Sequence, residues 1–219
     1  MALTPERVRA YREDYRNEVI GPGYRGWLHL ATITGICSAA VAIALARMTA
    51  ITWHDLWVVP TAWIFANLVE YAAHRGPMHH LNLGFGRLYK RHTSQHHRFF
   101  SRELMSVDGP RDFHVTLFPA WMSLFFVGLI GVPMALLVRL VFGHDIALLF
   151  YAAIVFYYLL YEWVHLGAHM SESSVLARLP LIRFARSHHG LHHDPSKMRR
   201  ANFNFAIPLG DWLFGTWER

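Results

Sequence analysis

Four long apolar runs limit what this chain of 219 residues can fold into. They cover residues 27–46, 57–73, 115–142 and 146–165. A bilayer core of roughly 30 Å needs about 20 apolar residues in a helix, and runs of this kind are typical of membrane spans. The runs therefore predict an all-α integral membrane protein with four transmembrane helices that form two hairpins.

The basic residues predict an orientation for these helices. Nineteen of the 21 Lys and Arg residues lie before the first run, between the second and third runs, or after the fourth. The positive-inside rule places these segments, including both termini, on the cytoplasmic side of a bacterial inner membrane or an ER-type membrane. The basic residues are not gathered into one arm, which argues against binding to nucleic acid.

We predict a single membrane domain over residues 1–219. In chain order its parts are an N-terminal interfacial helix (1–25), a transmembrane hairpin (27–73), one part of a cytoplasmic cap (74–113), a second hairpin (115–166) and the rest of the cap (167–219). A helix packed on the cap also fits the N-terminal pattern. The first twenty residues contain charges and no apolar core, so no cleavable signal peptide is expected.

The chain contains 16 histidines, and most of them lie in four short clusters at or just beyond the ends of apolar runs. All four clusters fall on the predicted cytoplasmic side, so the topology gathers them into one histidine-rich cap. The clusters contain His74, His79 and His80; His92, His96 and His97; His165 and His169; and His188, His189, His192 and His193.

The spacing within the clusters fits metal binding. Residues four apart share a helix face, so His92 with His96, and His165 with His169, can each hold one ion or bridge two. The last cluster offers histidines at positions i, i+3 and i+4. In the first cluster Pro77 separates two histidines that are five apart, which predicts ligands on either side of a helix break.

One ion takes four to six ligands, so about ten imidazoles imply two ions. Imidazole suits iron, zinc, copper and nickel, whereas magnesium and calcium prefer oxygen. A ligating ring usually donates its other N–H to a neighbouring acceptor. The nearby carboxylates that could accept are Glu70, Glu162 and Asp194.

The other histidines and the single cysteine receive ordinary roles. Structural or surface roles are expected for His29, His54, His114 and His144, and His80 and His188 are weaker ligand candidates than their neighbours. Cys37 lies inside the first apolar run, where apolar packing is expected, and one cysteine excludes a disulfide framework.

The ordered clusters resemble the histidine signature of the fatty acid hydroxylase/sterol desaturase superfamily. That signature reads H-x3/4-H, H-x2/3-H-H, H-x3/4-H and H-x2-H-H. The segment from Asn202 to Thr216, with Pro208, Asp211 and Gly215, also resembles the closing segment of that family. The similarity extends over about residues 55–217.

The resemblance implies a non-haem di-metal centre, normally two irons, that uses O₂ to oxidise an unactivated C–H bond of a lipid. Zinc is expected as a substitute in purified protein. Asn202 matches a polar residue near the last cluster. The ligands that the resemblance implies are His74, His79, His92, His96, His97, His165, His169, His189, His192 and His193.

We therefore predict a di-iron monooxygenase that hydroxylates a fatty-acyl or related lipid taken from the bilayer. Desaturation, and carotenoid or sterol-type substrates, stay open within the same superfamily. The chain contains no haem-binding His-Pro-Gly-Gly motif and no cysteine set for an iron–sulfur cluster. Electrons are expected from a separate ferredoxin or cytochrome b5 with its reductase.

A membrane metal-ion transporter is the alternative from another class. Transporters place ligands near the bilayer midplane, whereas these histidines gather at one end of the spans. The sequence also lacks the H-E-x-x-H motif of zinc metalloproteases.

Overall fold

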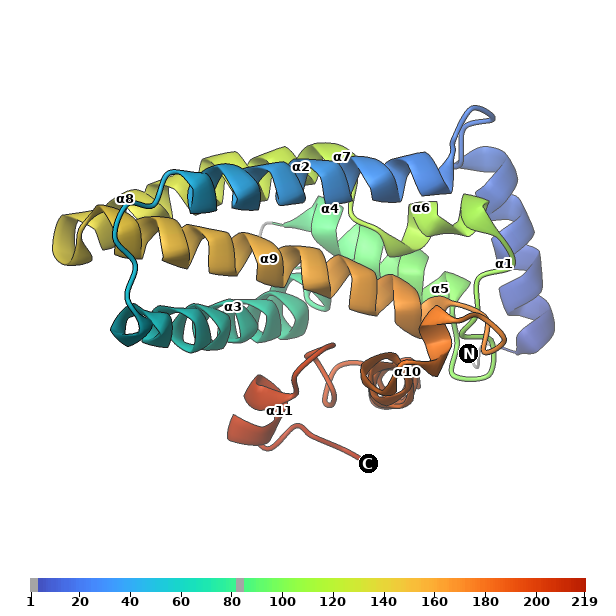
Figure 1. The fold of residues 1–219 in the computed structure, drawn as a ribbon. Helices are drawn as coiled ribbons and strands as arrows, with labels where there is room; N and C mark the ends of the chain where they lie inside the picture. The colour runs from blue at the N-terminus through green and yellow to red at the C-terminus, as the bar shows by residue number, and fades with distance from the viewer. Residues whose placement is uncertain (1–3, 82–84) are drawn as a thin grey trace. The chain divides into compact units, whose positions relative to one another are not determined.

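A computed structural model describes residues 4–81 and 85–219, and over these residues the chain is helical with no β-strand (Figure 1). The α-helices are α1 (Pro5–Glu18), α2 (Gly26–Ala46), α3 (Val58–Ala73), α4 (Gly86–Tyr89), α5 (His97–Phe99), α6 (Phe113–Thr116), α7 (Ala120–Leu124), α8 (Val132–Phe142), α9 (His144–His169), α10 (Pro180–His192) and α11 (Leu209–Leu213). Three π-helical segments are η2 (His74–Met78), η4 (Lys90–His96) and η6 (Phe125–Gly131), and short 3₁₀ segments are η1 (Trp53–Trp57), η5 (Pro110–Asp112) and η7 (Leu176–Arg178).

Four helical stretches are long and apolar enough to cross a membrane, which agrees in number with the four predicted spans. They are Gly26–Ala46, Trp53–Met78, Ala120–Phe142 and His144–His169. The third begins five residues later than predicted. Leu117 and Pro119 both have extended backbone angles, and Pro119, which lacks a backbone N–H, stands at the N-cap of α7.

The chain divides into two compact units, which are described separately. The histidine unit comprises the described residues of 1–27, 67–117 and 163–219, and the apolar unit comprises residues 28–66 and 118–162. Helices α3 and α9 each contribute residues to both units. The predicted organisation as one membrane domain with a cap stays a prediction.

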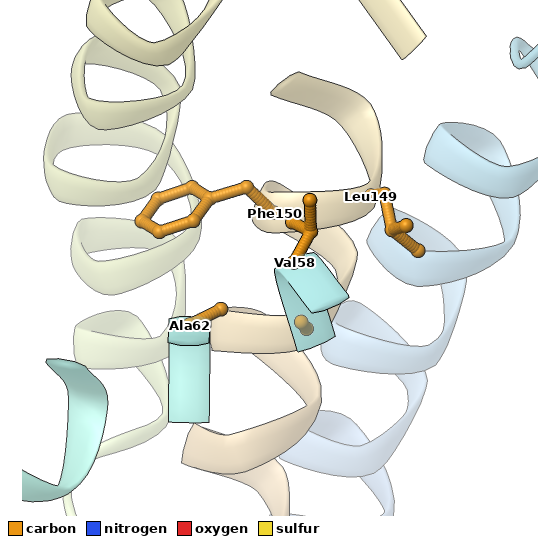
Figure 2. Packing of buried hydrophobic residues seen from close by; sticks show 5 residues of the cluster. Val58, Ala62, Leu149 and Phe150 are labelled. Carbon is orange, nitrogen blue, oxygen red and sulfur yellow. The ribbon is translucent and has the colours of Figure 1, made fainter. Parts of the chain in front are cut away.

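In the apolar unit, α3 packs against α9 through small and branched side chains. Val58 and Ala62 of α3 meet Leu149, Phe150 and Ala153 of α9, and all five are buried (Figure 2). Small residues such as Ala62 and Ala153 let apolar helices approach closely. The two helices therefore bury apolar side chains against each other within this unit.

Helix α8 of the apolar unit presents its large apolar side chains outward. Leu140 is 82% exposed and Val141 is 73% exposed. A helix that is apolar on its exposed face is costly in water and suits contact with lipid. This pattern is the one expected of a membrane span.

In the histidine unit, α1 is held against the segment that follows α5. Val8 and Tyr15 are buried, and the buried guanidinium of Arg12 donates to the carbonyl oxygens of Phe99 and Leu104 at 2.8 and 2.6 Å. Arg12 also donates to the Ser106 carbonyl at 3.0 Å. The helix therefore packs on the predicted cap, while its contact with a membrane surface stays a prediction.

Candidate metal centre

The site histidines lie in the last turn of α9, in α10 and in two π-helical segments. A π-helix forms i→i+5 hydrogen bonds and often marks a functional site. His74 begins η2 and His79 caps its end, so one wide turn brings residues five apart together. The predicted helix break between them is wrong, because Gly76 and Pro77 lie inside this continuous turn. His92 and His97 are five apart in the same way, at η4.

The ten predicted ligands lie together in the histidine unit, all at most 7% exposed, and they form two groups. The first group is His74, His79, His92, His97 and His192. The second group is His96, His165, His169 and His189. His193 joins the second group, because its Nε2 atom lies 3.1 Å from Nε2 of His96 and 2.9 Å from Nε2 of His189.

The Nε2 atoms within each group face one another at short distances. In the first group, Nε2 of His92 lies 2.8, 3.2 and 3.1 Å from Nε2 of His74, His79 and His97. In the second group, Nε2 of His96 lies 3.3 Å from Nε2 of His165, and Nε2 of His189 lies 3.1 Å from that of His169. Imidazoles that bind one ion at about 2.1 Å, at right angles to one another, have nitrogens about 3.0 Å apart. The spacing therefore suits a shared ion in each group.

Backbone carbonyl groups fix the tautomer of five of these rings. A carbonyl oxygen only accepts hydrogen bonds, so an Nδ1 atom that contacts one must carry the proton, which leaves a lone pair on Nε2. Nδ1 of His169 donates to Met105 at 2.7 Å and Nδ1 of His192 donates to Ala201 at 2.7 Å. The same contact joins His74 to Phe203, His96 to Val115 and His193 to Phe100.

Thr93 fixes a sixth ring through its hydroxyl group. The hydroxyl donates to the Met78 carbonyl at 2.6 Å, so its oxygen is left to accept from Nδ1 of His79 at 3.2 Å. Nε2 of His79 therefore also carries a lone pair. Among the described residues, Nδ1 of His97 and of His189 has no hydrogen-bond partner, so nothing at Nδ1 fixes their tautomers.

In each group, two lone pairs with no proton between them face each other. Nε2 of His79 lies 3.0 Å from Nε2 of His192 in the first group, and Nε2 of His96 lies 3.1 Å from Nε2 of His193 in the second. Such pairs repel each other unless a cation binds both. The donor chemistry of each group therefore fits a metal ion.

Burial keeps these imidazoles neutral. It lowers the pKa of His96 to about 3, and the positive charge of Arg91 adds to the effect. Burial also lowers the pKa of the other site histidines outside the spans, namely His79, His92, His97, His189, His192 and His193. A metal ligand must be neutral imidazole, so the site is prepared for ligation at neutral pH.

The carboxylates predicted as partners of the ligands form hydrogen bonds with nearby groups, and their role toward the ligands stays a prediction. Glu70 accepts from the Phe205 backbone N–H at 2.7 Å, and Asp194 accepts from Ser196. Glu162 lies in the apolar unit, where Tyr158 donates to it at 2.7 Å. Asn202 has a φ of 59° and bridges the His188 carbonyl to the backbone of Glu218.

The two weaker ligand candidates lie outside both groups. His80 is exposed. Nε2 of His188 instead lies 3.2 Å from the buried carboxylate of Asp211. Sequence reasoning missed the role of Asp211, which also accepts from the backbone N–H groups of Phe203 and Asn204 at 2.8 Å. Its position in the closing segment was the available signal.

Two buried phenylalanines of that segment pack on the imidazoles. The Phe205 ring stacks on His74 with centroids 5.1 Å apart, and it also lies 4.5 Å from His165 and from His189. Phe203 packs on the first group, 5.5 Å from His192. These rings exclude water from one side of the histidine cluster.

The family model for fatty acid hydroxylases matches residues 59–216, which include all four histidine clusters. The chain belongs to the fatty acid hydroxylase family. No curated protein matches the chain significantly.

Among solved structures, the chain is similar to full-length Scs7p, of which only the hydroxylase domain is visible. The two are 19% identical, with a TM-score of 0.61 over 89% of this chain and 67% of the other. This similarity supports a shared fold. The family, the four apolar spans and the buried histidine groups together support a membrane-bound lipid hydroxylase with a metal-binding centre.

Proposed function

We propose that this protein is a di-iron monooxygenase that uses O₂ to hydroxylate an unactivated C–H bond of a fatty-acyl lipid. The observation that carries the proposal is the pair of five-histidine groups in a fatty acid hydroxylase family member. Each group would hold one ion through its Nε2 atoms, and in six of the ten rings the hydrogen bond at Nδ1 already leaves a lone pair on Nε2. Two iron ions would supply the redox chemistry that activates O₂.

The protein residues have separate tasks in this proposal. The ten imidazoles would hold the ions without adding negative charge, and backbone carbonyls keep five of the rings in the Nδ1–H form. Phe203 and Phe205 keep water from the buried rings. The metal supplies the reaction itself, and the protein supplies geometry and a dry site.

The membrane arrangement belongs to the same proposal. Four spans would form two hairpins, with both termini and the metal centre on the cytoplasmic side. The substrate would enter from the bilayer, which suits an acyl chain better than a water-soluble molecule. Electrons would come from a separate acidic protein, a ferredoxin or cytochrome b5 type with its reductase, attracted by a chain of net charge +6.

The first test is metal content per chain in detergent-purified protein from iron-supplemented cells. We expect two ions per chain, with zinc replacing iron in part. His192→Ala should reduce the content of the first group and His96→Ala that of the second, and both should abolish turnover. His80→Ala is the matched control, because His80 is exposed and outside both groups.

The second test supplies ¹⁸O₂ and a reductant to membranes that contain the protein and analyses the lipids by mass spectrometry. Hydroxylation adds one labelled oxygen atom to the lipid, whereas desaturation removes two hydrogens and adds none. A purified protein with no retained metal, or full activity of His96→Ala, would contradict the proposal. Metal that exchanges freely without lipid oxidation would favour a transporter.

A further inference from the structure

A strongly cationic pocket lies in the histidine unit, apart from the ten histidines. It has a volume of about 750 Å³ and lies among the segment after α5, the segment after α9, α10 and the last residue of the chain. Five arginines and two glutamates line it, a formal charge of +3. The arginines are Arg102, Arg178, Arg183, Arg186 and Arg219.

Most of these guanidinium groups are available to a ligand. Arg183 is exposed and its side chain forms no hydrogen bond or ion pair with any described residue. Arg178 has one long hydrogen bond, 3.5 Å to the Ser173 carbonyl, and Arg102 lies 3.9 Å from Asp194. Weak partners of this kind contribute little, so the charges of Arg102, Arg178 and Arg183 are largely uncompensated.

Arg186 has a different role at the same pocket. It donates to the carbonyl oxygens of Ala168 and Met170 at 2.8 and 2.9 Å, at the C-terminal end of α9. It also donates to Ser106 at 3.0 Å. Arg186 therefore forms a fixed wall of the pocket, while Arg178 and Arg183 can turn toward a ligand.

The chemistry of the pocket favours a phosphate group. Guanidinium forks donate two parallel hydrogen bonds to phosphate oxygens, and several forks around one concave site match a multiply charged oxyanion. Glu103 and Glu172 line the pocket as well and offset part of the arginine charge, and Glu172 lies 3.5 Å from Arg186. The side chains that line the pocket still carry a formal excess of +3, which favours an anion.

The surrounding segment indicates that the phosphate belongs to a lipid. Four exposed apolar side chains flank Arg178 and Arg183 in the sequence directly after a membrane-length helix. They are Val175, Leu179, Leu181 and Phe184, which are 79%, 49%, 40% and 37% exposed. Apolar and basic residues interspersed next to a span are typical of the membrane interface, where arginine pockets bind anionic head groups. We propose that this pocket binds the phosphate head group of an anionic phospholipid.

The proposed lipid site contains none of the ten predicted metal ligands. It does contain residues from the same chain segments as these ligands. Met105 lines the pocket, and its carbonyl accepts from Nδ1 of His169. Gly190, which also lines the pocket, lies between His189 and Leu191 in α10. A bound head group would therefore brace the segments that carry the second histidine group.

The experiment measures lipid binding to the metal-loaded full-length protein in uncharged detergent by native mass spectrometry. The probe is dioctanoyl phosphatidic acid, and the comparators are dioctanoylglycerol, which lacks the phosphate, and inorganic phosphate, which lacks the acyl chains. The first variant is Arg178→Gln/Arg183→Gln. Its control is Arg7→Gln/Arg9→Gln on α1, which removes the same charge away from the pocket.

A second pair of variants separates charge from size. Ser187 is exposed on α10 and lines the pocket, so Ser187→Glu places a carboxylate in it, whereas Ser187→Gln adds a neutral side chain of the same size. Metal content and the thermal unfolding midpoint check that every variant is folded.

We expect phosphatidic acid to bind and the arginine double variant to weaken binding by about thirty-fold, since each basic residue contributes about a kcal/mol near an anionic lipid. Ser187→Glu should weaken binding and Ser187→Gln should not. Equal binding of inorganic phosphate would overturn the lipid assignment. Unchanged lipid binding in both pocket variants would overturn the site, and a loss only of turnover with the electron donor would reassign it to protein docking.

Discussion

Thr93→Val tests whether a hydroxyl group sets the tautomer of a metal-binding histidine. Valine has nearly the shape of threonine, so the buried packing is preserved while the hydroxyl is lost. Nδ1–H of His79 then loses its acceptor at 3.2 Å, and the Met78 carbonyl loses its donor at 2.6 Å. The His79 ring can respond by moving its proton to Nε2, where the proton blocks metal binding.

The magnitude follows from the cost of leaving a buried polar group unpaired. That cost is about 1–3 kcal/mol, which corresponds to a loss of metal affinity of roughly 10- to 100-fold in the first group. Among the described residues, the hydrogen bonds of the Thr93 side chain reach Met78 and His79 and no ring of the second group, so that group should keep its ion. The change is therefore selective for one of two ions.

The assay is competition with a chelator of known affinity, followed by metal content per chain. We expect wild-type protein to retain two ions at a chelator concentration where Thr93→Val retains one. Thr93→Ser, which keeps the hydroxyl, is the control and should behave like wild type. Equal chelator resistance of the valine variant and wild type would refute the tautomer argument.

Three further predictions concern the same unit. Arg12→Lys should lower the free energy of unfolding by about 3 kcal/mol, because one ammonium group cannot reach the three backbone carbonyls that Arg12 contacts. A decrease of less than about 1 kcal/mol in denaturant unfolding would contradict this prediction. Asp211→Asn should lower the free energy of unfolding by about 2 kcal/mol and weaken metal binding in the first group, because an amide has one oxygen to accept the N–H groups of Phe203 and Asn204. Unchanged resistance to a chelator would argue against this prediction. Burial lowers the pKa of histidines such as His96 below the unfolded value near 6.5, so the stability they provide is present above pH 6.5 and is lost as pH falls below it. The unfolding midpoint of metal-free protein should therefore change little from pH 8 to 7 and fall from pH 6.5 to 5, and a midpoint that rises on acidification would exclude this cause.

The four spans could be predicted because their signal is local. Each apolar run is as long as a bilayer is thick, and the helices end close to the predicted residues. The third span starts later than predicted, at Ala120, directly after Pro119 at the N-cap of α7. The signal of a proline is also local.

The division of the histidines into two groups could not be read from spacing. An α-helical pattern pairs His92 with His96, yet the structure puts His92 with His97 in one group and His96 in the other. The cause is the π-helical segment η4, in which residues five apart come together. Whether a short segment forms a π-helix depends on tertiary packing, so its sequence carries little signal.

The sequence predicts carboxylates as partners of the rings, because side chains are what a sequence displays. For rings such as His169, His96 and His192, the structure provides the carbonyl groups of Met105, Val115 and Ala201. Every residue has a carbonyl, so only the fold determines which of them reaches an imidazole. The histidine cluster could be predicted from the sequence, but the carbonyl groups that orient its rings could not.

The use of main-chain acceptors has a consequence for how this protein tolerates change. At Phe100, Met105 and Ala201 the group that orients a ring persists whatever side chain is present. Alanine scanning at these positions would therefore leave the orienting contact in place and report only packing. Replacing the amide bond after each residue with an ester, whose carbonyl is a weaker acceptor, would expose the contribution that side-chain variation conceals. Side-chain substitutions at these positions should therefore leave the ring orientation in place, whereas a shift of the backbone would change it.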